Sequence, residues 1–327
     1  MNKKIISQGF LIVNKAHFLD RYDMIDDEIL CLDDAMKRLL LIIILILAAL
    51  LVGCGADPTP DIAATTLPVY EFTTRLCDGT DLTVGRLVTE SVSCLHDYTL
   101  QVSQMQMIEG ADTVVVSGAG LEEFLEEALD GSKARIDASA GAHIHEAEEG
   151  HDHEHDDHGH IHEQDPHIWL SPENAKTMAQ NICNGLCRQY PVYRDIFQEN
   201  LDGLIADLDN LQRYGEENLA QLSCREIITF HDGFAYFAES FDLTILRAVE
   251  EESGSEASAS ELKELIDIVK EHNLPAIFTE INGSASAADV IAAETNANIF
   301  ALDMAMSGDG YFDAMYHNID TIKEVLE

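Results

Sequence analysis

Histidine is the residue type with the clearest chemical pattern in this sequence. Residues 143–162 read HIHEAEEGHDHEHDDHGHIH and hold eight of the fourteen histidines of the chain. Carboxylates alternate with these histidines and no apolar period is present, which predicts a mobile loop. Imidazole is a good ligand for zinc, copper and nickel, so we expect the loop to collect metal ions loosely. The histidines of this auxiliary loop are His143, His145, His151, His153, His155, His158, His160 and His162.

Four further candidate metal ligands are His96, His167, His231 and Asp303. The first follows the second predicted strand. His231 and Asp303 directly follow later predicted strands, and His167 lies just ahead of a predicted helix. Two of the four come from each half of the chain and are expected to project into one crevice. Three neutral imidazoles and one carboxylate suit a near-tetrahedral Zn²⁺ site with bonds of about 2.0–2.2 Å. Manganese would prefer more oxygen ligands.

The elements that must position these residues alternate between short apolar runs and amphipathic segments, which predicts parallel sheets flanked by helices. In the first half, strands are predicted over 62–69, 84–88 and 112–117, and helices over 70–77, 99–109 and 121–129. The second half repeats the pattern, with strands over 226–230, 243–249, 276–279 and 299–302 and helices over 233–240, 260–271, 284–294 and at the end of the chain. The GAG at 118–120 is interpreted as a tight turn.

Two segments with helical periodicity, 172–189 and 193–221, lie between the two series. Ser171 can cap the first of them, and Pro172 suits its first helical position. The second would be roughly 40 Å long at 1.5 Å per residue. The predicted fold is therefore α/β, with two lobes, each built on a mainly parallel sheet flanked by helices, joined by one long rigid helix. Such a fold usually binds its ligand in the crevice between the lobes.

The N-terminal region is interpreted as a targeting segment. Residues 39–52 are fourteen consecutive apolar residues after a Lys-Arg pair. This run is shorter than the roughly 20 residues of a transmembrane helix and typical of a signal-peptide core. It ends in Leu-Val-Gly-Cys54, which resembles the lipobox at which bacterial lipoproteins are cut and diacylated. Cys54 is therefore the predicted lipidation site, and we expect a protein anchored by lipid on the extracytoplasmic face of the cell membrane.

The domain boundaries follow from these segments. We predict that residues 1–53 are an upstream extension and lipoprotein signal peptide, with the true start at Met36. Residues 54–61 form a tether. The N-terminal lobe covers 62–190 and includes the loop 143–162, the linking helix covers 191–222, and the C-terminal lobe covers 223–327.

Charge and cysteine content restrict the possible partners. The chain has 19 basic and 60 acidic residues and a net charge of −41, which disfavours nucleic acid as a partner. Without Cys31 and the lipidated cysteine, an odd number of cysteines remains, so at least one thiol is free and the pairing stays open. The five are Cys77, Cys94, Cys183, Cys187 and Cys224.

Several longer motifs together resemble one family over residues 62–327. They are HDYTL, ADTVVVSGAGLEEFL, DPHIWLSPENA, FHDGFAYFAESFDL, IFTE, AAETNANIFALD and YFDAMYHNI. The family is that of the metal-specific solute-binding lipoproteins of ABC importers, in particular the zinc-uptake members. The resemblance implies metal binding by the three histidines named above, with the aspartate as a possible fourth ligand. Manganese-preferring members often carry glutamate at the third position, so His231 indicates zinc.

Two positions qualify this ligand set. Met304-Ala305 replaces the Pro-Leu that usually follows the aspartate in the family, so water is an alternative to Asp303 as fourth ligand. Glu280, at the end of a predicted strand, could orient a ligand histidine from behind, although a plain surface carboxylate is equally compatible with the sequence.

The resulting functional prediction is a monomeric binding protein that captures Zn²⁺ between its lobes. It would deliver the ion to a membrane permease driven by a separate ATPase, because the sequence contains no P-loop motif. An enzyme is not expected, since no HExxH motif occurs. A manganese-binding homologue, with Mn²⁺ as the ligand, and a surface zinc store or adhesin remain alternatives.

Overall fold

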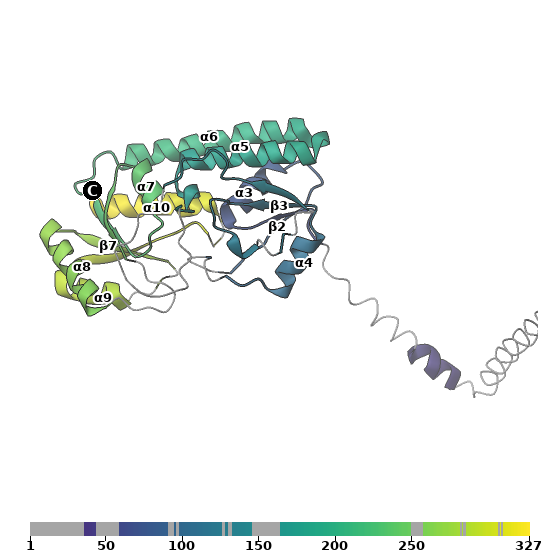
Figure 1. Ribbon diagram of the computed structural model, residues 1–327, viewed down its shortest axis with the longest axis horizontal. Helices are drawn as coiled ribbons and strands as arrows, with labels where there is room; N and C mark the ends of the chain where they lie inside the picture. Colours follow the sequence, from purple (N-terminus) through teal and green to yellow (C-terminus); the bar gives the residue numbers. More distant parts are fainter. Residues whose placement is uncertain are drawn as a thin grey trace, which may run out of the picture. The chain divides into compact units, whose positions relative to one another are not determined.

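The computed structural model describes two separate units of the chain, Met1–Pro58 and Thr59–Glu327 (Figure 1). The described residues are 36–43, 59–90, 95, 98–125, 128–129, 133–145, 164–249, 258–281, 283, 286–306, 308 and 310–327. In the first unit, residues 36–43 are helical. Within the described part of the chain, no helix is long and apolar enough to cross a membrane. Residues 44–58, with the predicted cleavage and lipidation site, lie outside the described residues.

The first half of the larger unit is built on a four-stranded parallel sheet in the order β2-β1-β3-β4. Its strands are β1 (Ile62–Ala64), β2 (Val84–Arg86), β3 (Thr113–Val116) and β4 (Ala134–Asp137). All four residues of β3 are buried, as expected for the centre of a sheet covered on both faces. The helices of this half are α3 (Leu67–Leu76) and α4 (Val102–Gly110).

The second half repeats the same strand order, β6-β5-β7-β8, again with every pair parallel. Its strands are β5 (Glu226–Thr229), β6 (Thr244–Ala248), β7 (Ala276–Glu280) and β8 (Asn298–Leu302). Its helices are α7 (Ala235–Ser240), α8 (Ala259–His272), α9 (Ser286–Thr295) and α10 (Tyr311–Leu326). The two halves are therefore two lobes with one shared topology.

Two neighbouring helices run side by side along the lobes, α5 (Pro172–Gln189) and α6 (Arg194–Asn218) (Figure 1). The 25 residues of α6 make it about 38 Å long. It packs on α3 in the first lobe and on α10 in the second. One hydrophobic core contains Phe72 and Trp169 from the first lobe together with Phe237 and Tyr311 from the second. The predicted fold class is thus confirmed, and the lobes share a continuous core.

The glycine-alanine-glycine turn after β3 has the tight geometry that the sequence indicates. Gly118, Ala119 and Gly120 all have positive φ, at 85°, 53° and 85°. The buried carboxylate of Glu122 accepts hydrogen bonds from the backbone N–H of Ser117 at 2.7 Å and of Gly118 at 3.0 Å. This side chain therefore satisfies the backbone donors that the sharp turn leaves free.

Three elements differ from the prediction. The strand expected over 62–69 ends at Ala64, because Pro68 lies in the first turn of α3, where its fixed φ suits a helix start. In place of the helix expected over 121–129, the described residues form a 3₁₀ turn at Glu123–Leu125. Strand β4 is absent from the prediction, because its sequence ARID carries two charges in four residues.

Candidate metal site

The structure brings two of the four predicted ligands together. His231 lies two residues after β5, at the carboxyl end of the sheet. His167 directly precedes the 3₁₀ turn Ile168–Leu170, which leads into α5. The hydroxyl of Ser171 accepts a hydrogen bond from the backbone N–H of Asn174, so the cap expected from the sequence is present and fixes the start of α5. His96 lies outside the described residues.

The two imidazoles face each other through their Nε2 atoms, which are 3.2 Å apart. Their rings are nearly perpendicular, with an interplanar angle of 89°. Two nitrogen ligands of one tetrahedral zinc ion, at about 2.0–2.1 Å from the metal, would be about 3.3 Å apart. His167 and His231 therefore already have the separation of two ligands of a single ion.

A carboxylate stands behind each imidazole. His167 Nδ1 lies 2.7 Å from Asp165 Oδ1, which also accepts a hydrogen bond from the His167 backbone N–H at 3.0 Å. His231 Nδ1 lies 2.9 Å from Glu280 Oε1. In metal sites, such carboxylates fix the tautomer and orientation of a ligand histidine and raise its basicity. With a carboxylate beside Nδ1 on both rings, Nε2 is the atom that each ring presents to an ion.

The electrostatics of the pair favour a cation at this point. Burial acts to lower the pKa of His231, but the neighbouring carboxylates of Glu280, Asp232 and Asp165 together outweigh burial and raise it, with Glu280 contributing most among them. Glu280 is only 7% exposed, and its Oε1 has no well-aligned hydrogen-bond donor despite the short distance to the ring. A positive ion bound at Nε2 would increase the positive charge of the ring and so compensate the negative charge of this buried carboxylate oxygen.

Asp303 follows β8 directly but is committed to other contacts in this structure. Its Oδ1 accepts a hydrogen bond from the backbone N–H of Ala305 at 2.8 Å, and Asn318 bonds both its backbone N–H and its carbonyl. Burial raises the pKa of its carboxyl group. Among the described residues, Asp303 does not form with His167 and His231 a group whose ligand atoms all lie within 4.8 Å of one another.

The site is held by hydrogen bonds that cross from one lobe to the other. The indole N–H of Trp169 donates to the carbonyl of Met304 at 2.7 Å, next to Asp303. The Tyr311 hydroxyl donates to the carbonyl of Trp169 at 2.8 Å. Both aromatic side chains are fully buried. The segments that carry the candidate ligands of the two lobes are thereby joined directly beside the histidine pair.

Two contributors to this site were not predicted from the sequence. Asp165 stands two residues before His167, and this Asp-x-His spacing was the available signal for it. Gly233 packs against both histidines, because a Cβ built on it would lie 2.7 Å from His231 Cδ2 and 3.1 Å from His167 Cε1. No local sequence pattern indicates that Gly233 contacts both histidines, because this contact depends on the approach of the two lobes.

The described cysteines are separate from the site. They are free thiols, namely Cys77, Cys183, Cys187 and Cys224. Cys94 lies outside the described residues, so a pairing that involves it stays open.

Comparisons with known proteins identify the family of the chain. Residues 62–325 match the family model described as zinc-uptake complex component A, periplasmic. The zinc-binding lipoprotein AdcA of Streptococcus pneumoniae is 30% identical over 89% of this chain, and the chain spans 62% of the length of that relative. The zinc uptake protein ZnuA of Bacillus subtilis is 30% identical, over 81% of this chain and 87% of the relative.

Solved structures give the same assignment. A crystal structure of ZnuA is 29% identical and superimposes with a TM-score of 0.70, over 82% of this chain and 100% of that chain. A zinc-bound ZnuA deletion mutant is also 29% identical, with a TM-score of 0.69, over 82% of this chain and 98% of that one. The family model covers most of the chain, and the solved structures match its fold over 82% of the chain. The chain belongs to the family of zinc-uptake complex component A.

Proposed function

We propose that this protein binds Zn²⁺ outside the cytoplasm, between His167 and His231, and delivers it to an ABC-type metal importer. The Nε2 pair at 3.2 Å, with a carboxylate behind each ring, is the observation that carries the proposal. His96 would be the third ligand. Asp303 or water would be the fourth, and a water ligand would leave the present hydrogen bonds of Asp303 intact.

The donor set supports zinc as the transported ion. Imidazole nitrogen suits zinc, whereas manganese prefers sites richer in oxygen. The relatives named as zinc-binding and zinc-uptake proteins, and the zinc-bound ZnuA neighbour, point in the same direction. The partners would be a membrane permease and a separate ATPase. The protein itself would act as a monomer held at the membrane by a lipid on Cys54.

Metal binding by the full chain tests this proposal, provided that the histidine-rich segment no longer competes for the ion. Six of its histidines are therefore replaced. We define the loop-His variant as the full chain with asparagine at six positions, His151, His153, His155, His158, His160 and His162. This variant is equilibrated with equal Zn²⁺ and Mn²⁺ and then dialysed against a chelator that sets a low free zinc concentration.

The expected result is about one retained zinc ion per chain, lost when His231→Ala is added. His272→Ala is the matched control, because His272 also pairs with a carboxylate, Glu226, at 2.9 Å. Glu226 is the first residue of β5, whereas His231 follows the other end of that strand. Retained manganese in place of zinc would overturn the choice of ion. A zinc content that His231→Ala leaves unchanged would overturn the site.

A further inference from the structure

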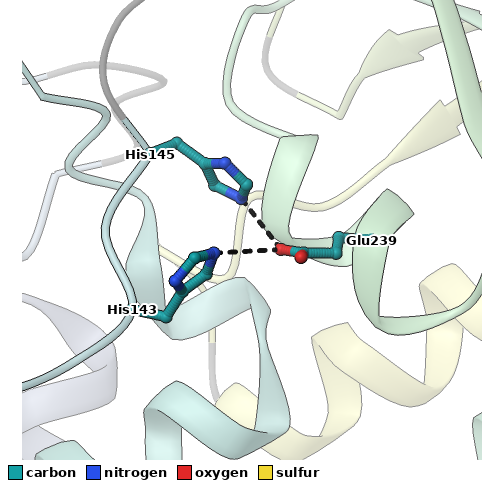
Figure 2. A group of neighbouring side chains, drawn as sticks. All are labelled: His143, His145 and Glu239. Carbon is teal, nitrogen blue, oxygen red and sulfur yellow. Dashed lines mark hydrogen bonds and ion pairs between the residues drawn. The ribbon is translucent and has the colours of Figure 1, made fainter.

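A second group of potential metal ligands lies apart from His167 and His231, which we call the crevice pair after the crevice predicted from the sequence. It consists of His143, His145 and Glu239, whose ligand atoms all lie within 4.8 Å of one another (Figure 2). His145 Nε2 is 2.9 Å and His143 Nε2 is 3.6 Å from Glu239 Oε2. Figure 2 shows both rings directed at the same carboxylate oxygen. Among the described residues, this is the one group of three or more such side chains within that spacing.

The backbone that carries the two histidines is fixed by other side chains. The Asn174 side chain accepts a hydrogen bond from the His143 N–H and donates one to the His143 carbonyl, both at 2.8 Å. The backbone N–H of His145 donates to the Tyr236 hydroxyl at 2.9 Å, and its ring lies against the Tyr236 ring, with centroids 4.5 Å apart. The histidines therefore stand on an ordered base and are not part of a free loop.

The group joins the two lobes. His143 and His145 lie after β4 of the first lobe, whereas Glu239 lies on α7 of the second. The His145 carbonyl accepts a hydrogen bond from the backbone N–H of Asp165, the residue that holds His167. The Tyr236 hydroxyl in turn donates to the Asp165 carbonyl at 2.7 Å. One residue thus connects this group with the crevice histidines.

We propose that His143, His145 and Glu239 form a second site for a divalent transition metal ion such as Zn²⁺, separate from the crevice pair and weaker than it. Two imidazoles and one carboxylate match the three protein ligands of an open zinc site, with water as the fourth ligand. The site differs from the loose collection of ions expected of the histidine-rich segment, because it has a fixed set of three ligands.

The present spacing explains why the site should be weaker. Ligand atoms of a tetrahedral ion would be about 3.3 Å apart, so the three side chains must close around it. The His143 and Glu239 side chains are 66% and 58% exposed, so packing does not hold them in place, and ordering them on binding costs affinity. The crevice pair needs no such movement, because its nitrogens are already 3.2 Å apart. Two classes of zinc site with distinct affinities are the consequence.

A zinc titration of the loop-His variant tests the proposal, with bound metal measured at increasing free zinc. We expect two ions per chain, the second bound more weakly. Glu239→Gln or His145→Ala should weaken the second ion at least about tenfold and leave the first unchanged. His231→Ala should remove the first ion and retain the second. His272→Ala, which removes an exposed histidine paired with only one carboxylate, should change neither.

Each outcome decides between the two sites. Binding of a single ion that His231→Ala removes would overturn the second site and leave the crevice site standing. A second ion whose affinity neither Glu239→Gln nor His145→Ala alters would overturn the ligand assignment. Thermal unfolding of the metal-free variants shows whether each has folded, and both substitutions lie at partly or fully exposed positions where folding should be retained.

Discussion

Replacing Asp165 with asparagine removes one negative charge from the candidate zinc site and changes little else. Asp165 Oδ1 accepts hydrogen bonds from the His167 backbone N–H and lies 2.7 Å from His167 Nδ1. An asparagine side chain has the same shape and keeps an oxygen in that position. The variant leaves the candidate ligand His167 in place. It therefore tests whether the charge of the carboxylate behind His167 contributes to zinc affinity.

The size of the effect follows from the burial of this pair. The side chains of His167 and Asp165 are only 4% and 13% exposed, so solvent screens their interaction weakly. Hydrogen bonds to charged groups contribute about 1.5–3 kcal/mol, against about 0.5–1.5 kcal/mol for neutral ones. Losing the charge should thus cost about 1–1.5 kcal/mol of zinc-binding free energy, or about a tenfold loss of affinity, since 1.4 kcal/mol corresponds to tenfold.

The assay is competition for zinc against a chromophoric chelator, with the loop-His variant as the parent protein. Glu226→Gln is the matched control, because it removes the carboxylate from another His–Glu pair at 2.9 Å, where the side chains are 34% and 41% exposed. The control should bind zinc as the parent does. If the zinc affinity of Asp165→Asn is also within about twofold of the parent, the charge behind His167 does not support metal binding. The inference that the carboxylates behind the two histidines strengthen zinc binding would then be refuted.

Three further outcomes are expected. Neighbouring carboxylates, above all Glu280, together outweigh burial and raise the pKa of His231, so below this pKa zinc must displace a proton from the ring. In zinc competition from about pH 5 to pH 8, the apparent Kd should rise about tenfold per pH unit below this pKa and level off above it. Gly233→Ala places a Cβ 2.7 Å from His231 Cδ2 and should weaken zinc binding about tenfold. Its control, Gly203→Ala in α6, has open space around it and should stabilise the fold by about 0.5–1 kcal/mol. In the same helix, the Cβ of Gly215→Ala would overlap the Phe241 ring, which should destabilise the protein by about 1–3 kcal/mol in denaturant unfolding. Equal stability of the Gly203→Ala and Gly215→Ala variants would contradict this packing.

The parts of the fold that could be predicted from sequence are those determined by local signals. Helix α5 begins and ends where expected, at residues 172 and 189, because a serine cap and a proline at the first helical position define its start. The buried strand β3 was predicted because its run of valines is bounded by a turn. Strand β4 was missed because its alternation of charged and apolar residues is too short to produce a period, and its pairing with β3 is a tertiary contact.

The candidate site divides in the same way. His167 and His231 could be selected as candidate ligands because each is next to a recognisable element, a helix start and a strand end, and the structure brings the two rings together. The second group could be predicted only in part. His143 and His145 belong to an obvious histidine-rich segment, but nothing in the sequence pairs them with Glu239, ninety-four residues beyond His145. That partner is brought into place by the packing of the lobes, which local patterns do not encode.

The shared core also limits how a bound ion could leave the crevice. Trp169 and Tyr311 are fully buried between the lobes and are linked by a hydrogen bond. Burying an aromatic side chain removes about 150–250 Å² from water, so exposing each of them would cost about 4–6 kcal/mol. Separating the lobes far enough to expose both would cost about 8–12 kcal/mol, which is comparable to the whole stability of a typical domain. Metal exchange should therefore proceed through small local movements of the ligand-bearing segments, while the core between the lobes stays closed.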